Sequence, residues 1–240
     1  LSQPVGGVPY VFVGGQGGLL DIVAAPDFAS SNLIFFSFSE PGRGGAGTAV
    51  ARARLVRDGN QAGLKDVDVI FTMAKKTRVT RHFGSRLAFA PDGTLFITTG
   101  DRGEPNRAQD MHDHAGAVIR INIDGSIPSD NPASGGADQL PELWSKGHRN
   151  AQGAAWDPVL AMLLTVEHGD KGGDEVSQAK AGRNYGWPII SYGVTYGGDQ
   201  IGVGTEAPGY EQPVYYWDPY IAPSGLAVYQ GEMFPECKGD

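Results

Sequence analysis

Short apolar runs with a strand-like pattern recur along the chain. Residues 32–39 are rich in aromatic and β-branched side chains, and residues 94–99 follow an Asp-Gly pair that is typical of a turn. Residues 117–123 alternate between apolar and polar positions and end at a second Asp-Gly pair, which is a hairpin signal. No 12-residue window without Gly or Pro carries the apolar stripe of an amphipathic helix. The pattern therefore predicts an all-β fold.

Four apolar segments resemble one another, which indicates an internal repeat. They begin at residues 18, 85, 153 and 225, so that successive units lie about 70 residues apart. Repeated four-stranded sheets stack around an axis as the blades of a β-propeller, because a lone sheet leaves a face uncovered. We expect about four blades in a single propeller domain over residues 1–240. Long loops at one end of the blades would carry the binding residues.

Composition and charge exclude several classes of protein. The 240 residues carry 19 Lys and Arg against 27 Asp and Glu, a net charge of −8, which argues against a nucleic-acid partner. No apolar run approaches the roughly 18 residues that span a bilayer. Cys237 is the single cysteine, so the sequence has neither an internal disulfide nor a cysteine metal cluster. The chain begins at Leu1 and ends in a turn-like stretch, and we expect an excerpt that lacks blades at its ends.

Polar side chains stand just before each of the first three repeats. Gln16 precedes the first repeat, His82 the second, and Arg149 with Asn150 the third. On a propeller these equivalent positions face the central axis, so we expect them to converge. Histidine suits a general base near neutral pH, and arginine offers several donors to a carboxylate or a quinone oxygen. The alternative for each residue is a structural role in its loop.

Three further motifs have competing interpretations. Residues 167–175 hold four carboxylates and three glycines, which suit Ca²⁺ or, equally, a solvated acidic turn. The glycines of residues 42–47 match a dinucleotide-binding fingerprint, but the alternating residues that follow predict a hairpin loop instead. His112 and His114 have a metal-like spacing on a predicted strand. Because no third ligand lies near them in the sequence, we interpret both as surface residues.

Six short motifs follow one another along nearly the whole chain. They are residues 16–21 (QGGLLD), 82–87 (HFGSRL), 147–150 (GHRN), 172–175 (GGDE), 184–188 (NYGWP) and 221–226 (IAPSGL). As a set they resemble the soluble pyrroloquinoline quinone (PQQ)-dependent sugar dehydrogenases, in particular the aldose sugar dehydrogenase branch of the glucose/sorbosone dehydrogenase family. The resemblance implies a six-bladed propeller, of which this chain would hold about four blades.

The same resemblance implies a function and a set of site residues. The enzyme would oxidise the anomeric hydroxyl of aldoses to lactones with hydride transfer to PQQ, and an external acceptor would take the electrons. Ca²⁺ would be a second cofactor, and the location would be periplasmic or secreted. His82 matches the general base, and Arg149 matches the residue that stabilises charge on the quinone oxygen. The implied PQQ contacts are Gln16, Arg149, Asn150 and Tyr196, and the implied calcium ligands are Glu175 and Tyr185.

One position departs from the family, and two other functions remain open. Asp170 stands where the family has proline, beside the implied calcium site. The first alternative is a non-catalytic propeller that binds a carbohydrate or a protein. The second is a propeller lactonase that uses Ca²⁺, which would keep the acidic segment but has no use for Gln16, His82 and Arg149.

Overall fold

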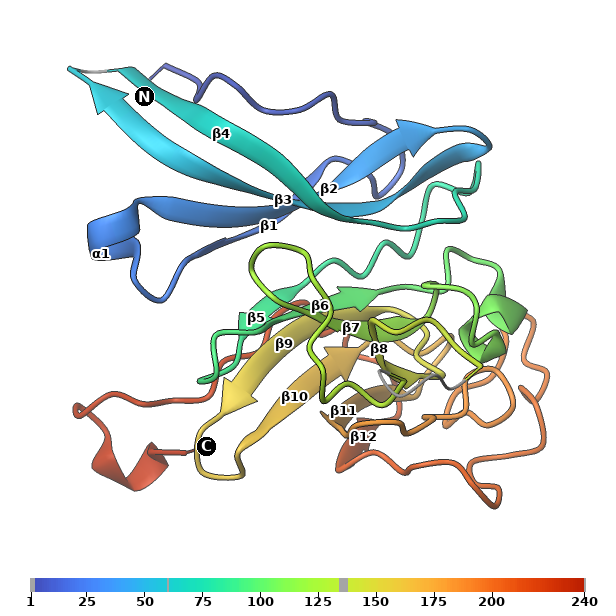
Figure 1. Cartoon of the computed structure of the whole chain (residues 1–240). Helices are drawn as coiled ribbons and strands as arrows, with labels where there is room; N and C mark the ends of the chain where they lie inside the picture. Colours follow the sequence, from blue (N-terminus) through green and yellow to red (C-terminus); the bar gives the residue numbers. More distant parts are fainter. Residues whose placement is uncertain (1–2, 60, 134–137, 240) are drawn as a thin grey trace.

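The computed structural model describes residues 3–59, 61–133 and 138–239 (Figure 1). Within them, twelve strands form three antiparallel sheets, and neighbouring strands follow one another in chain order. The first sheet contains β1 (Leu19–Ala24), β2 (Leu33–Gly42), β3 (Gly45–Asp58) and β4 (Gln61–Thr72). The second contains β5 (Leu87–Phe89), β6 (Leu95–Thr99), β7 (Ala117–Ile121) and β8 (Leu143–Lys146). The third contains β9 (Ala151–Asp157), β10 (Met162–Glu167), β11 (Asp174–Ala179) and β12 (Tyr215–Trp217).

The three sheets are arranged as the blades of a propeller. Their first strands, β1, β5 and β9, lie next to one another, and the later strands follow outward (Figure 1). Hydrogen bonds join equivalent places in adjacent blades. The N–H of Leu87 donates to the carboxylate of Asp21 at 2.9 Å, and Arg86 Nε donates to the carbonyl of Gln152; in both pairs the partners are 66 residues apart. The all-β propeller prediction is therefore confirmed.

The strands predicted from the sequence are present with small shifts at their ends. Residues 32–39 lie mainly in β2, residues 94–99 in β6 and residues 117–123 in β7. β2 and β3 form a long hairpin whose pairing reaches the turn, where Gly42 lies opposite Gly45. The hairpin interpretation of this glycine motif is thus confirmed, and no helix begins there to bind a dinucleotide.

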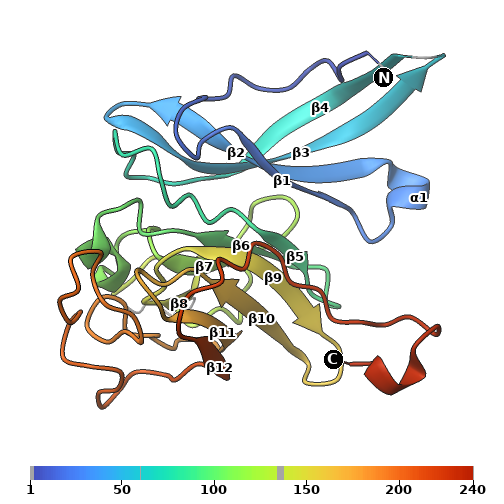
Figure 2. The same ribbon diagram turned by 180° about the vertical axis from the view of Figure 1, so that it is seen from behind.

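The fourth repeat does not form a blade in the described residues. Residues 225–229 have no strand pairing and run as an extended segment beside β9 (Figure 2). Just before them, the carbonyl of Ser224 accepts a hydrogen bond from Arg86 at 2.8 Å, and that of Pro223 lies 2.9 Å from His168 Nε2. A segment becomes a strand only beside a partner with which it can share backbone hydrogen bonds. The expected four blades therefore correspond to three sheets and one extended segment.

The core lies between the faces of adjacent blades. Phe35 and Leu95 are fully buried between the first and second sheets, where the Phe35 ring meets that of Phe89 edge-on at 5.2 Å. Phe96 is buried between the second and third sheets and stacks on Trp156 with a centroid distance of 6.2 Å. Each blade thus covers an apolar face of its neighbour.

Helical structure in the described parts of the chain is limited to three short segments. They are the α-helix α1 (Phe28–Ser31) and two 3₁₀ helices at Pro105–Gln109 and Pro235–Cys237. This confirms the predicted scarcity of helices. No described helix has the length and apolar character that a membrane crossing requires.

Lys146, at the end of β8, ties the loop over residues 105–115 to the second blade. Its buried Nζ donates to the carbonyls of Arg107, Asp113 and Ala115 at 3.2, 3.0 and 2.6 Å. Burial lowers the pKa of Lys146 to about 8. The loop is therefore fixed to the blade at three of its carbonyl groups.

We expect Phe35→Ala to lower the free energy of unfolding by about 3–5 kcal/mol, because it leaves a cavity between the first two blades. Val159→Ala, in the exposed turn between β9 and β10, should change it by less than about 0.5 kcal/mol. Urea denaturation followed by tryptophan fluorescence measures both values. Similar losses in the two variants would contradict this description of the core.

Candidate active site

Loops at the same end of the three blades surround one cavity of about 250 Å³, called here the central cavity. Gln16 precedes β1, His82 precedes β5 and Arg149 precedes β9, whereas Asp101 follows β6 and Tyr196 lies between β11 and β12. All five line the cavity. The structure therefore brings together four of the residues that the sequence assigned to the PQQ site, and their individual roles stay predictions.

The backbone turns sharply at His82. Its φ of 55° lies in the left-handed region, which is uncommon for residues other than glycine. The N–H of His82 donates to Oε1 of Gln16 at 2.6 Å, which stabilises the turn. A Cβ on Gly100 would lie 2.2 Å from the carbonyl oxygen of His82, so glycine is needed for this close approach. His82 is thereby held beside the end of β6.

His82 is paired with Asp101, a fully buried carboxylate. Its Nδ1 lies 2.7 Å from Oδ1 of Asp101. The same carboxylate accepts the N–H of Gly103 at 2.7 Å and the indole N–H of Trp187 at 2.8 Å. Burial by itself would raise the pKa of Asp101, but these hydrogen bonds and the charge of the imidazole together lower it below its ordinary value. The carboxylate therefore stays ionised, and Nε2 is the ring nitrogen of His82 that remains for a ligand.

Arg149 supplies a positive charge to the central cavity. Its guanidinium donates to the carbonyl of His168 and to Oδ1 of Asp170, each at 3.1 Å, and lies 5.3 Å from the centre of the Trp187 ring. Its Nε is buried without a hydrogen-bond partner among the described residues. Because buried polar atoms almost always have a partner, this N–H is a candidate donor for a bound group.

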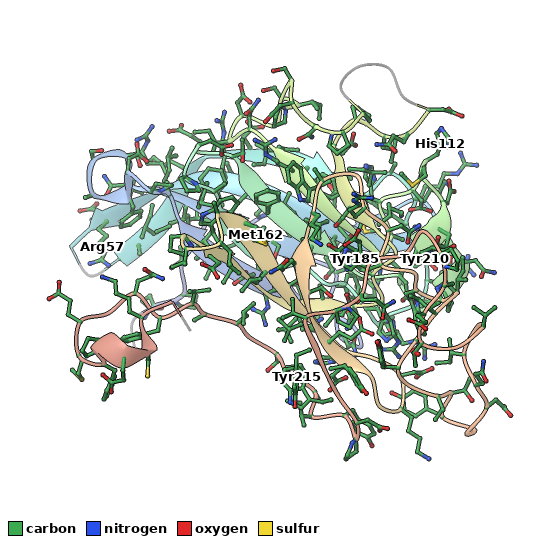
Figure 3. The ribbon with its side chains drawn as sticks, turned by 90° about the horizontal axis from the view of Figure 1, so that it is seen from below. Arg57, His112, Met162, Tyr185, Tyr210 and Tyr215 are labelled. Carbon is green, nitrogen blue, oxygen red and sulfur yellow. The ribbon has the colours of Figure 1, made fainter. Side chains whose placement is uncertain are left out.

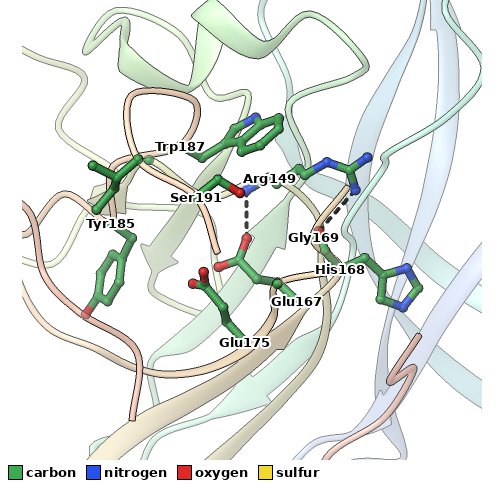
Figure 4. A pocket seen from close by; sticks show the side chains of 11 residues that line it. Arg149, Glu167, His168, Gly169, Glu175, Tyr185, Trp187 and Ser191 are labelled. Carbon is green, nitrogen blue, oxygen red and sulfur yellow. Dashed lines mark hydrogen bonds between the residues drawn. The ribbon is translucent and has the colours of Figure 1, made fainter. Parts of the chain in front are cut away.

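A smaller cavity of about 20 Å³ adjoins the central cavity and shares Arg149 and Trp187 with it. Glu167 and Glu175 pair in the register of β10 and β11 and extend side by side into this acidic cavity (Figure 4). The space suits one group about the size of a water molecule. Removal from water raises the pKa of Glu175 well above its ordinary value, and the charges of Glu167 and Asp174 raise it further. A cation would relieve this repulsion.

Tyr185 lies in the interior of the molecule, beside the acidic cavity (Figure 3). Its hydroxyl accepts the N–H of Lys180 at 2.9 Å and donates to the carbonyl of Gln178, and its ring stacks on His148 at 4.6 Å. Burial raises the pKa of Tyr185 to about 12. With the hydroxyl engaged in this way, a contribution of Tyr185 to a cation site would come from its backbone carbonyl.

Calcium binding at Glu175 and Tyr185 stays a prediction. Across the described ranges, no three or more His, Cys, Asp and Glu side chains are grouped so that they could hold a metal ion. The donors that do meet at the acidic cavity are carboxylate oxygens, the kind of ligand that Ca²⁺ prefers. The acidic cavity therefore offers the type of ligand atom that Ca²⁺ prefers. The described side chains alone do not form a complete set of calcium ligands.

Glu167 fixes the loop that carries Arg149. Its Oε2 accepts the backbone N–H of Arg149 at 2.6 Å, and its Oε1 lies 2.8 Å from Nδ1 of His148. Nε2 of His148 in turn lies 2.9 Å from the hydroxyl of Ser145. This order of residues resembles a hydrolytic triad, but Ser145 and His148 are fully buried and no substrate reaches them. The network therefore positions Arg149.

Two predicted PQQ contacts occupy different places around the site. Asn150 is buried in the wall of an adjoining cavity that also includes Gln16, and its Oδ1 accepts the N–H of Gly84 at 3.1 Å. Tyr196 is exposed at the edge of the central cavity. Asn150 thus lines a cavity that shares Gln16 with the central cavity, and it does not line the central cavity itself.

The surface interpretation of the two neighbouring histidines is correct for one of them. His112 is exposed and lies at the periphery (Figure 3). His114 is buried, and both of its ring nitrogens have partners. Its Nδ1 accepts the N–H of Ala74 at 3.1 Å, and its Nε2 lies 2.6 Å from Glu142. Neither residue lies on a strand. His114 is therefore a structural histidine with both nitrogens satisfied.

Three site residues were not assigned a role from the sequence: Asp101, Glu167 and Trp187. The sequence did offer a signal for Asp101: a carboxylate that stands just after the buried strand 94–99, at the loop end of a blade. Glu167 and Trp187 stand within motifs described above. The bond between Trp187 and Asp101 spans 86 residues, and no sequence pattern indicates it.

The fold and the site define a β-propeller in which a His–Asp pair and an arginine face one cavity. The chain belongs to the family described as Glucose / Sorbosone dehydrogenase, whose model matches residues 1–240. Aldose sugar dehydrogenase YliI of Escherichia coli is 43% identical over 239 residues, which cover 98% of this chain and 64% of YliI. The chain thus spans less than two thirds of the length of this curated relative.

Solved structures show the same similarity. The crystal structure of the soluble aldose sugar dehydrogenase (Asd) from Escherichia coli in the apo-form matches with a TM-score of 0.93 and 42% identity, over 99% of this chain and 69% of that chain. The PQQ-bound form of aldose sugar dehydrogenase from Streptomyces coelicolor matches with a TM-score of 0.74 and 32% identity, over 92% and 60%. The family resemblance drawn from the six motifs is therefore confirmed.

We expect Asp101→Asn to lower the free energy of unfolding at neutral pH and to have a much smaller effect in acid. The pKa of Asp101 is lower in the native state than in the unfolded chain, so the native state binds fewer protons. The stabilisation is therefore present above about pH 4 and is lost as the pH falls through the native pKa. We expect a loss of about 1–3 kcal/mol at pH 7. Urea denaturation of both proteins at pH 7 and pH 3 measures it, and an equal difference at the two pH values would contradict the assignment.

Proposed function

We propose that this chain forms the cofactor site of a quinoprotein that oxidises the anomeric hydroxyl of aldoses to lactones. PQQ would accept the hydride, and an external acceptor would take the electrons. The observation that carries the proposal is a single cavity lined by the His82–Asp101 pair and by Arg149, whose buried Nε–H lacks a partner among the described residues. Relatives that are aldose sugar dehydrogenases, one of them solved with PQQ bound, support it.

The central cavity fits PQQ in its charge and in its donors. PQQ is a flat quinone with three carboxylates, so its site needs cations and hydrogen-bond donors. Arg149 and Arg81 both line the cavity. When bound, PQQ supplies a quinone carbonyl that accepts a hydride. The residues that would hold it are Gln16, Arg149, Asn150 and Tyr196.

His82 would take the proton from the anomeric hydroxyl at Nε2. The hydrogen bond to Asp101 keeps a proton on Nδ1 and leaves the lone pair on Nε2. When the imidazole gains a second proton, the adjacent carboxylate stabilises the positive charge. A general base placed in this way contributes roughly 10²–10⁴ to the rate.

Arg149 would stabilise the negative charge that develops in the cavity as the hydride leaves the sugar. The carbonyl of His168 and the carboxylate of Asp170 hold the guanidinium in place, so it needs little rearrangement during the reaction. Glu175, with the backbone carbonyl of Tyr185, would hold Ca²⁺ in the acidic cavity, which shares Arg149 with the central cavity.

The direct test of this function is dye reduction. Purified chain incubated with PQQ and Ca²⁺ should bleach a dye acceptor when an aldose is added. Bound PQQ without dye reduction by any aldose would contradict the proposal and favour a non-catalytic propeller. Hydrolysis of a lactone without PQQ would also contradict it and favour the hydrolase.

His82→Gln should lower kcat by about 10²–10⁴ and leave PQQ binding within about twofold, because it removes the base and keeps the cavity wall. Turnover is followed by dye reduction, and PQQ binding by quenching of protein fluorescence. His112→Gln, the same substitution at an exposed residue away from the cavity, is the matched control and should match the unmodified chain. Unchanged turnover in His82→Gln would contradict the assigned role.

Asp170→Asn should tighten PQQ binding by about three- to tenfold. The carboxylate lines the central cavity and partly neutralises Arg149, so its removal leaves more positive charge for an anionic ligand. Asp66→Asn, which alters an exposed carboxylate on β4, should leave the Kd unchanged. Titration by fluorescence quenching measures each Kd. Weaker binding in Asp170→Asn would show that positioning of Arg149 outweighs the charge.

A further inference from the structure

Trp187 lies where the loops of the second and third blades meet. It is buried, and its ring packs against Ala108 and Ile201. Its backbone N–H donates to the carbonyl of Gly147 at 2.9 Å, and its own carbonyl accepts the side-chain amide of Gln109 at 2.6 Å. Trp187 is therefore fixed by hydrogen bonds at its backbone N–H and carbonyl and by packing around its ring. The indole has little freedom to move.

The indole N–H fixes the carboxylate that pairs with the base. It donates to Oδ2 of Asp101 at 2.8 Å, while Oδ1 of the same residue faces His82 at 2.7 Å. A carboxylate held at both oxygens cannot rotate about its terminal bond. The direction of Oδ1, and with it the orientation of the His82 ring, therefore depends on Trp187.

The same ring touches the cation of the site. The guanidinium of Arg149 lies 5.3 Å from the centre of the Trp187 ring (Figure 4), within the range of a cation–π contact. Trp187 also lines both the central cavity and the acidic cavity. One side chain thus contacts the carboxylate of the base pair through its edge and the cation of the cavity through its face.

We propose that Trp187 is a positioning residue that fixes the general base and the arginine of the central cavity relative to each other. Its part in catalysis rests on the proposed function, whereas its effect on the geometry of His82 is a property of the chain alone. The ring orientation of His82 and the placement of Arg149 would both depend on this one side chain.

Four charged side chains line the central cavity together with His82. They are Asp101 from the end of β6, Arg81 from the preceding residue, and Arg149 and Asp170 from the third blade. Asp101 is the group in direct contact. Loss of the indole donor would free Oδ2 of Asp101 and let the carboxylate rotate, whereas the other three groups would be unchanged.

The first test uses the full chain without cofactor. Trp187→Phe keeps an aromatic ring near Arg149 and removes the indole donor. The matched control is Trp144→Phe, which removes an indole bond of 2.7 Å to the carbonyl of Ala179 away from the cavity. Nitrogen-15 NMR of the imidazoles should show His82 mainly as the Nδ1–H tautomer in the unmodified chain and the control. In Trp187→Phe we expect mixed tautomers, because Oδ1 of Asp101 no longer has a fixed direction.

An unchanged tautomer in Trp187→Phe would overturn the proposal. If that variant does not fold, Asp101→Ala serves instead, read at the indole N–H resonances. The resonance of Trp187 should move because its acceptor is gone, and that of Trp144 should not. An unmoved Trp187 resonance would equally overturn the proposal.

The second test uses the chain loaded with PQQ and Ca²⁺. Trp187→Phe should lower kcat roughly tenfold with a smaller change in KM. In the Asp101→Ala background the same substitution should cost less than about twofold, because the donor has already lost its partner. If the loss of kcat in the double variant equals the product of the losses in the two single variants, the proposal is overturned. Absence of aldose oxidation in the unmodified chain would refute the proposed function alone, since the NMR test decides the role of Trp187 without it.

Discussion

Hydrogen bonds between residues 66 positions apart hold successive blades in register, and the site depends on that register. Because each blade repeats the geometry of the one before, the residues that precede the inner strands all arrive at one end of the axis. A one-residue slip in a blade would turn His82 or Arg149 away from the central cavity. The bonded pairs are Gln16 with His82, Gly84 with Asn150, Asp21 with Leu87, and Arg86 with Gln152.

Arg149 links the two cavities electrostatically. Its backbone N–H is bound by Glu167, which lines the acidic cavity, and its side chain is bound by Asp170 at the central cavity. Each cavity also has a carboxylate whose proton affinity is altered by its surroundings, since the pKa of Asp101 is lowered and that of Glu175 is raised. Fixed charges away from water act more strongly than the same charges in solvent, so small shifts of these groups have large effects.

Local and repeated features of the sequence were sufficient to predict the fold and part of the site. Alternating strands and a spacing near 70 residues indicated the propeller, and equivalent positions in the repeat indicated Gln16, His82 and Arg149. Trp187 and Asp101 meet across 86 residues from loops of two different blades, so no local pattern could pair them. The burial of His114 likewise depends on tertiary packing rather than on local sequence.

A crystal structure of the chain soaked with PQQ and Ca²⁺ tests most directly whether the loops around the central cavity bind one flat redox ligand. We predict electron density for the quinone in the central cavity, within hydrogen-bonding distance of Arg149 and facing Nε2 of His82. Quinone density at another place on the propeller, or a central cavity that holds only solvent at saturating PQQ, would contradict the proposed site.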